Sequence, residues 1–235
     1  IARVADNKIM TRATTMMMIT ITTPPPAATP VAPSAYNSWV GTSVEIRGFC
    51  SFDDSDKLGI DRLRESQILE ALEGKEFVPN ILYWDADVLV TEYISGVKLD
   101  NESLKSSEFR SHLSSVLCRI QTTYVTDMNR FSYLECCNSY ARNLPYNPSE
   151  VVDWQRLCLV AKEIDRSFWA PVLCHHDLIA DNIIIRRDSI VFIDWEFAAL
   201  GHPAFDYVKL FGENTPRGML SGSDISPSVI KQIKF

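Results

Sequence analysis

The sequence predicts an α+β fold in two lobes, of which the first carries strands and one helix and the second is mainly helical. Two observations support this fold class. Strand-like segments with one helical segment among them fill residues 43–93, and segments with helical periodicity fill most of residues 106–166. The chain has 235 residues and 46% hydrophobic content, which is enough apolar material for two lobes that each bury a core.

Residues 1–40 differ in composition from the rest of the chain. They hold a Met/Thr tract and then several prolines among Ala and Thr, including Pro24, Pro25 and Pro26. Such a segment buries too little apolar surface to offset the entropy that it loses on ordering. We therefore expect residues 1–40 to be a disordered or low-complexity segment that the fold does not need.

The smaller lobe is expected over residues 41–96. Its helix is ended by Gly74, since glycine is typical of the position that follows a helix. The β-branched and aromatic segments between polar turns read as strands. The predicted elements are a strand at 43–47, a helix at about 60–73, and strands at 81–84 and 88–93.

The larger lobe is expected over residues 97–235. Helical periodicity predicts four helices, at about 106–122, 131–144, 149–166 and 203–211. A tail rich in Gly, Ser and Pro follows the last of them. Because the segment after Asp206 is short, we expect this lobe to be truncated.

Composition and charge exclude some classes of function. The formal net charge is −7, and no run of Lys and Arg forms the basic patch that a nucleic-acid-binding protein usually carries. No stretch of about 20 apolar residues is present, so the sequence predicts no membrane span. The six cysteines form no CxxC pair, which is typical of reduced thiols in a cytoplasmic protein.

Residues 174–194 carry the most informative pattern. Two apolar runs, 183–185 and 190–193, flank a polar turn at 186–189, as in an antiparallel hairpin. If the turn centres near Asp188, residues that are equally far from Asp188 along the two strands lie opposite each other. This spacing predicts that the two strands bring polar side chains together at the open end of the hairpin.

The polar residues at that end are Asn182 and Asp194. Directly opposed residues have Cα atoms about 4.5–5.5 Å apart. Two oxygen-bearing side chains at that distance can share a hard cation such as Mg²⁺. Asp177, in the preceding loop, can reach the same region. Phosphoryl transfer needs these parts, namely a cation on the phosphates and a carboxylate for the proton of the attacking hydroxyl.

These residues belong to motifs that resemble those of the aminoglycoside phosphotransferase and choline kinase superfamily, the small-molecule relatives of protein kinases. Asp-Trp-Glu in place of Asp-Phe-Gly favours the choline-kinase-like or thiamine-kinase-like branch. A weaker resemblance extends over about 44–99. The motifs are His175-x-Asp177-x-x-x-x-Asn182, Ile193–Asp194–Trp195–Glu196 and Gly201-x-Pro203-x-x-Asp206.

The resemblance implies a protein-kinase-like fold, ATP and Mg²⁺ as cofactors, and roles for particular residues. Asp177 matches the catalytic base, and Asn182 and Asp194 match the metal ligands. His175 matches a histidine that braces the catalytic loop, and Asp206 matches a carboxylate that supports that loop. The neighbouring His176 is expected to be exposed.

In the smaller lobe, the resemblance assigns a nucleotide-binding role to three places. Arg47 matches the cation that contacts the phosphates, and Glu65 matches its ion-pair partner. Glu92, Tyr93 and Ile94 match the linker between the lobes, whose backbone hydrogen-bonds adenine. No motif of a nucleotide-covering loop precedes Arg47, so this lobe is expected to be incomplete. Arg47 as a surface cation and Glu65 as a solvated charge remain open as alternatives.

The sequence thus predicts an ATP-dependent phosphotransferase that acts on the hydroxyl of a small cationic molecule such as choline or thiamine. Six acidic residues and only two cations, Arg186 and Arg187, lie between Asp177 and Asp206, and such a surplus attracts a cation. Trp195 and Phe197 either flank that cation or pack in the core. Aminoglycoside phosphotransferase, an inactive truncated remnant and a histidine-aspartate metal site are the alternatives.

Overall fold

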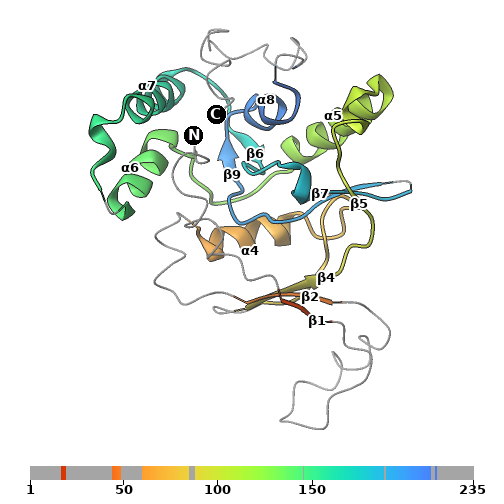
Figure 1. Ribbon diagram of the computed structural model, residues 1–235. Helices are drawn as coiled ribbons and strands as arrows, with labels where there is room; N and C mark the ends of the chain where they lie inside the picture. The colour runs from red at the N-terminus through yellow and green to blue at the C-terminus, as the bar shows by residue number, and fades with distance from the viewer. Residues whose placement is uncertain are drawn as a thin grey trace, which may run out of the picture.

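The computed structural model describes residues 17–19, 44–48, 60–84, 88–144, 146–187, 189–212 and 215. Figure 1 shows the two-lobed α+β arrangement that the sequence predicts, with a small sheet at one end and most helices at the other. The fold class is therefore confirmed.

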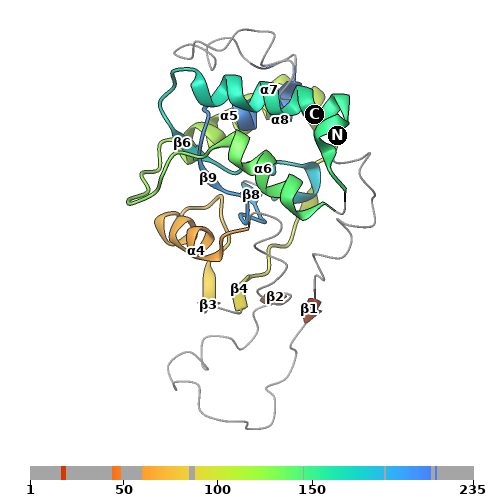
Figure 2. The ribbon, with the colours of Figure 1, turned by 90° about the vertical axis from the view of Figure 1, so that its left-hand side faces the viewer.

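The smaller lobe contains an antiparallel sheet with the strand order β1-β2-β4-β3. Helix α4 lies between this sheet and the larger lobe (Figure 2). The predicted strands at 43–47, 81–84 and 88–93 are present with shifts of one residue at most. The elements are β1 (Met17–Ile19), β2 (Val44–Gly48), α4 (Arg62–Ala71), β3 (Ile81–Trp84) and β4 (Val88–Glu92).

Strand β1 falls inside the segment 1–40, which was expected to lack regular structure. Met17–Ile19 pairs antiparallel with Val44–Ile46 of β2, because an edge strand offers free backbone groups to any extended neighbour. The rest of that segment lies outside the described residues.

Helix α4 begins and ends where local chemistry requires it. The Asp61 carboxylate caps its N-terminus by accepting a hydrogen bond from the Arg64 N–H at 3.0 Å. Gly74 follows the helix with a φ of 74°, a conformation that costs glycine little. Ile68, Leu69 and Leu72 are buried in the main core, so α4 packs against the larger lobe as well as against its own sheet.

The larger lobe carries four α-helices among the described residues, each close to its predicted range. Two small sheets lie among them, with orders β5-β7-β8 and β6-β9. The sequence did not indicate β5, β6 or β9, which are two or three residues long. The elements are β5 (Val97–Lys98), α5 (Ser107–Gln121), α6 (Tyr133–Asn143), α7 (Val152–Arg166), β6 (Val172–Cys174), β7 (Ile183–Ile185), β8 (Ile190–Phe192), β9 (Ala199–Gly201) and α8 (Phe205–Phe211), with short 3-10 helices at Ser103–Lys105, Pro148–Glu150 and Ala180–Asn182.

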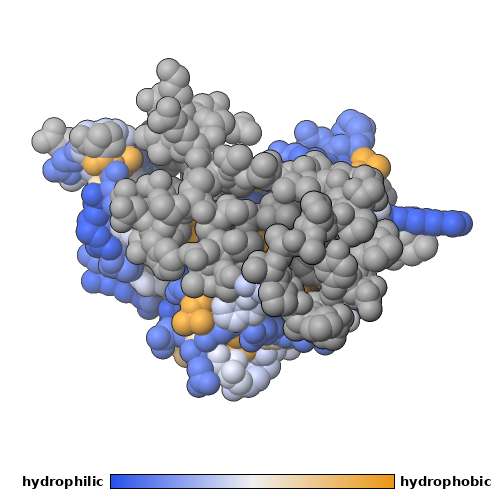
Figure 3. All heavy atoms as spheres, turned by 90° about the horizontal axis from the view of Figure 1, so that it is seen from below, coloured by the Kyte–Doolittle hydropathy of each residue, from blue (hydrophilic) through white to orange (hydrophobic). Residues whose placement is uncertain are grey.

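Three apolar clusters hold these elements together. The largest joins α4, α5 and the inner faces of β7 and β8, and a second lies between α6, α7 and α8. The third joins the outer face of the hairpin to the linker. In the view from below, hydrophobic side chains of the described residues show only in small groups among hydrophilic ones (Figure 3). No helix among the described residues is long and apolar enough to span a membrane.

Candidate active site

The loop that carries Asp177 is anchored by a buried carboxylate. Asp206, at the start of α8, is 1% exposed, and its two oxygens accept hydrogen bonds from the backbone N–H groups of His175 and His176 at 2.8 and 3.0 Å. Burial raises the pKa of Asp206 to about 6, although those two hydrogen bonds act in the opposite direction. The loop backbone is thus fixed to α8 just before the residue that matches the catalytic base.

His175 links the loop to the strand that precedes Asp194. Its Nδ1 accepts the backbone N–H of Asp177 at 3.4 Å, so its Nε2 carries the proton and donates to the carbonyl of Ile193 at 3.0 Å. Both ring nitrogens are therefore engaged, and the ring is buried. This geometry contradicts the alternative of a histidine-aspartate metal cluster, and no cluster of three His, Cys, Asp or Glu side chains suited to a metal occurs in the described part of the chain.

Asp177 and Asn182 are in direct contact. The Asn182 Nδ2 group donates to the Asp177 carboxylate and to the Asp177 carbonyl, both at 3.0 Å. Burial raises the pKa of Asp177, and so does the nearby negative charge of Asp194, while the positive charge of Lys209 and the hydrogen bond from Asn182 act against them. A carboxylate with a raised pKa beside a second carboxylate is typical of catalytic sites.

The register of the hairpin differs from the prediction. Ile183 pairs with Phe192, and the Ile193 N–H donates to the Asn182 carbonyl at 3.0 Å, so Asn182 faces Ile193 and not Asp194. The turn closes with a hydrogen bond from the Arg186 N–H to the Ser189 carbonyl. The prediction assumed that the hairpin is centred on residue 188. The observed pairs Ile183–Phe192 and Ile185–Ile190 are centred half a residue earlier, so each residue faces a partner one position earlier than predicted.

Asp194 nevertheless lies near enough to Asp177 for their charges to interact, and the chain leaves the strand there in an unusual conformation. Its φ is 69°, in the left-handed region that residues other than glycine rarely adopt. Trp195 anchors the following turn: it is 2% exposed, and its Nε1–H donates to the Phe192 carbonyl at 2.9 Å. Trp195 is therefore a core residue and cannot provide an aromatic face for a bound cation.

Glu65 is buried and ion-paired, and its observed partner is one that the sequence analysis missed. The Arg62 guanidinium lies 2.6 Å from the Glu65 carboxylate and 3.3 Å from that of Glu196. The spacing of three residues between Arg62 and Glu65 on a helix was the available signal. Arg47 lies on β2, and its side chain is outside the described part of the structure, so the Arg47–Glu65 pair stays a prediction.

The acidic surplus is smaller than the sequence suggested. Asp181 pairs with Lys98 at 2.9 Å, and Glu196 pairs with Arg62. Both cations come from earlier parts of the chain, which a count between residues 177 and 206 does not include. Near the loop itself, the Asp177 and Asp194 carboxylates are close enough to interact, and the positive charge of Lys209 also acts on Asp177.

The linker lies next to the outer face of the hairpin. Glu92 ends β4, and its carboxylate accepts a hydrogen bond from Asn80 at 2.8 Å. Ile94 is buried with Ile184, Val191 and Ile193 in the third apolar cluster, whereas Tyr93 is 41% exposed. The three linker residues thus place one apolar side chain against the hairpin.

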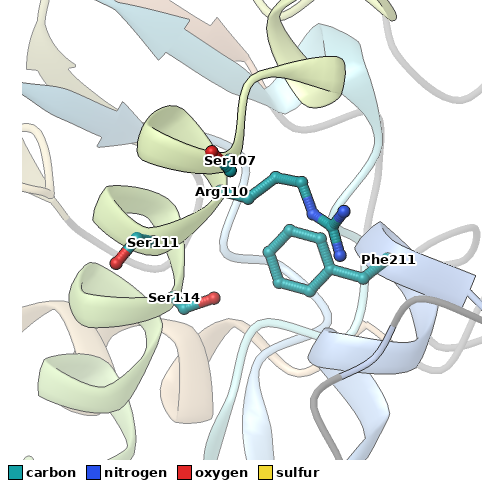
Figure 4. Close-up of a pocket in the computed structure, with 5 residues that line it drawn as sticks. All are labelled: Ser107, Arg110, Ser111, Ser114 and Phe211. Carbon is teal, nitrogen blue, oxygen red and sulfur yellow. The ribbon is translucent and has the colours of Figure 1, made fainter.

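A separate hollow of about 410 Å³ lies away from this site, between α5 and α8 (Figure 4). The Arg110 guanidinium lies over the Phe211 ring at 5.5 Å from its centroid. The residues that line it are Ser107, Arg110, Ser111, Ser114 and Phe211, none of which belongs to the motifs.

The fold defines the structural class of this protein, which is the protein-kinase-like fold. More specifically, the chain belongs to the choline/ethanolamine kinase family, whose sequence model matches residues 38–226.

Individual relatives and solved structures agree with this. Mouse ethanolamine kinase 2 is 25% identical over 177 residues, which cover 69% of this chain and 45% of the relative. The LicA homologue of Metamycoplasma hominis is 31% identical over 144 residues, or 57% of this chain and 54% of the relative. The chain thus spans about half the length of these relatives. The choline kinase LicA from Streptococcus pneumoniae has the same fold, with a TM-score of 0.64, 20% identity and coverage of 82% of this chain and 73% of that one.

Proposed function

We propose that this chain carries the catalytic part of an ATP-dependent kinase that phosphorylates the hydroxyl of a small cationic alcohol, with choline and ethanolamine ahead of thiamine. The observation that carries the proposal is the contact between Asp177 and Asn182 beside Asp194, in a loop held by buried hydrogen bonds. Family membership supports the same reaction class.

In the proposed reaction, the ionised carboxylate of Asp177 accepts the proton of the acceptor hydroxyl. The oxygen of that hydroxyl forms a bond to the γ-phosphorus of ATP, and the bond from that phosphorus to the β–γ bridging oxygen breaks, so ADP leaves. The raised pKa of Asp177 suits a general base, because a stronger base takes the proton more readily.

The residues present fit a magnesium ion. The Asn182 Nδ2 is used by Asp177, which leaves the Oδ1 oxygen as the ligand atom, and the Asp194 carboxylate lies close by. Mg²⁺ is commonly held by one or two protein oxygens together with substrate phosphates and waters. Bound there, Mg²⁺ would neutralise charge on the transferring phosphates.

The nucleotide is proposed to lie between the lobes, with its base against the linker Glu92–Ile94 and the apolar outer face of the hairpin. The support for this position is apolar, since Ile94, Ile184 and Val191 are buried together where the linker meets the hairpin, and ligand sites are lined mainly by such side chains. Arg47 and Glu65 are proposed to act at the phosphates. With the domain boundaries proposed from the sequence, 41–96 and 97–235, Arg47, Glu65 and the linker belong to the smaller lobe.

A cationic acceptor is proposed because the Asp177 and Asp194 carboxylates lie close enough to interact, with Lys209 offsetting part of their charge. Two carboxylates raise the local concentration of an ammonium and repel an anionic acceptor. The relatives' names, ethanolamine kinase 2 and choline kinase LicA, favour small amino alcohols over an aminoglycoside.

Steady-state kinetics with choline, ethanolamine, thiamine, kanamycin and a neutral sugar would test this proposal, with ADP release as the readout. We expect kcat/KM to be highest for choline or ethanolamine. Preference for the neutral sugar would overturn the electrostatic argument, and preference for kanamycin or thiamine would overturn the choice of acceptor. Absence of ATP turnover with every acceptor would favour the inactive remnant.

A further inference from the structure

His176 occupies a strained position directly before Asp177. Its φ is 65°, in the left-handed region, where a residue with a bulky side chain is uncommon. In the described residues only Asp127, His176 and Asp194 are non-glycine residues with positive φ, and two of these three belong to the site. Such strain persists only where the surroundings hold it in place.

Two hydrogen bonds fix the His176 ring, which was expected to be exposed but is half-buried. The Tyr133 hydroxyl accepts the backbone N–H of His202 at 2.8 Å, so its own proton is free to donate to the His176 Nε2 at 3.1 Å. Nδ1 then carries the imidazole proton and donates to the Phe197 carbonyl at 3.2 Å. Burial lowers the pKa of His176 to about 3, so the ring is neutral and this tautomer is compatible with both bonds.

The packing around the ring leaves little freedom. Phe131 and Phe205 lie against it, with ring centroids at 4.7 and 4.8 Å. A Cβ atom at Gly201 would lie 2.6 Å from the His176 Cε1 and 2.9 Å from the Tyr133 hydroxyl, so only glycine fits there. The glycine of the Gly201-x-Pro203 motif thus makes room for the histidine.

We propose that His176 is a positioning residue for the catalytic base. Tyr133 holds the His176 ring in place, and Gly201 leaves the space that the ring needs. The side chain does not reach the reacting atoms. It fixes the left-handed peptide that precedes Asp177, and through it the direction of the carboxylate. This inference rests on the proposed kinase function, in which Asp177 must face the acceptor hydroxyl within a narrow range of angles.

A double-mutant cycle of His176→Ala and Tyr133→Phe in the full chain tests the role. We expect kcat to fall about tenfold for His176→Ala and about threefold for Tyr133→Phe, with the KM for ATP unchanged within about twofold. Tyr133→Phe should lower kcat less in the His176→Ala background than in the wild type, because only its bond to the His202 N–H is left to lose there. The matched controls are His112→Ala and Tyr124→Phe, which change exposed residues and should leave kcat as it is.

Hydrogen exchange of the residue-176 amide, which donates to Asp206, gives a readout that does not need activity. We expect exchange about fivefold faster or more in both variants and unchanged in both controls. A kcat within twofold of the wild type for His176→Ala, additive effects in the cycle, or unchanged exchange would overturn the positioning role. If the wild type transfers no phosphate, the kinase proposal fails, and the exchange rates still decide whether His176 holds the loop.

Discussion

The two acidic segments of the site are held in different ways. The loop with Asp177 is fixed inside the larger lobe, by backbone hydrogen bonds to the buried Asp206 and by the ring of His175. The segment that follows Asp194 is joined to the smaller lobe, because Glu196 forms an ion pair with Arg62 of α4 at 3.3 Å. The loop with Asp177 is therefore held within its own lobe, whereas the segment that follows Asp194 is held to both lobes.

This difference indicates which part of the site a movement between the lobes would displace. Buried hydrogen bonds to a carboxylate are costly to break, whereas a partly exposed ion pair contributes little and is screened by salt. A displacement of α4 would therefore reach Glu196 and Asp194 before it reached Asp177.

The largest effect is expected from Asp177→Asn, which removes the proton acceptor and leaves the shape of the loop intact. Turnover should fall by about 10²–10⁴-fold, as is typical for loss of a general base. The matched control is Asp181→Asn in the same loop, since Asp181 is exposed and paired only at the surface with Lys98. Equal turnover of Asp177→Asn and the control would contradict the assignment.

Asp194→Ala is expected to weaken binding of the magnesium–nucleotide complex. Residues that only hydrogen-bond a metal ligand already contribute about 10–100-fold to metal affinity, so loss of a ligand itself should lower the affinity at least that much. Titration calorimetry with ATP in the presence and absence of Mg²⁺ would measure it. If the variant binds ATP in the presence of Mg²⁺ as tightly as the wild type does, Asp194 is not a metal ligand.

Asp206→Asn should destabilise the larger lobe, because an amide offers one acceptor to two backbone N–H groups. The expected cost is about 1–3 kcal/mol in the free energy of unfolding. Asp206 has a folded-state pKa of about 6, above the ordinary value for Asp, so the folded protein binds the proton more tightly than the unfolded chain does. Its contribution to stability is therefore greatest below about pH 4 and declines as the pH rises through 6.

Urea unfolding at pH 4 to 7 would test both the size and the direction of that effect. The stability difference between wild type and Asp206→Asn should shrink as the pH rises. A difference that grows with pH would mean that the hydrogen bonds to the carboxylate outweigh its burial.

The smallest effect is expected at the link between the lobes. A double-mutant cycle with Arg62→Gln and Glu196→Gln should give a coupling of about 0.5–1 kcal/mol that weakens in high salt. The exposed pair of Lys105 and Glu102, at the end and just before the start of one short 3-10 helix, serves as the control, where we expect no measurable coupling. Coupling at Arg62 that salt does not change would show that the link is buried and rigid.

What could be predicted from the sequence depended on how local each feature is. The helices of the larger lobe and the hairpin follow from periodicity within one segment, and the motif residues around Asp177 lie within about 30 positions of each other. The pairing of Asn182 with Ile193 was missed because one residue in the turn decides the register.

Contacts that join distant segments were beyond the sequence. Arg62 and Glu196 are far apart in the chain, as are Lys98 and Asp181, so charge counts in one stretch could not include their partners. His176 was expected to be exposed, because nothing near it in the sequence indicates Tyr133 or the space at Gly201. Only the folded chain brings those groups together.

The central claim is that Asp177 accepts the proton of a small alcohol while the γ-phosphoryl group of ATP moves to it. The most direct measurement follows ATP, ADP and the phosphorylated acceptor together by phosphorus NMR, with choline and ethanolamine as acceptors and Mg²⁺ present. The account predicts one phosphorylated acceptor for each ADP with the wild type and with Asp181→Asn, and almost none with Asp177→Asn. Inorganic phosphate in place of a phosphorylated acceptor, or equal product from Asp177→Asn, would contradict it.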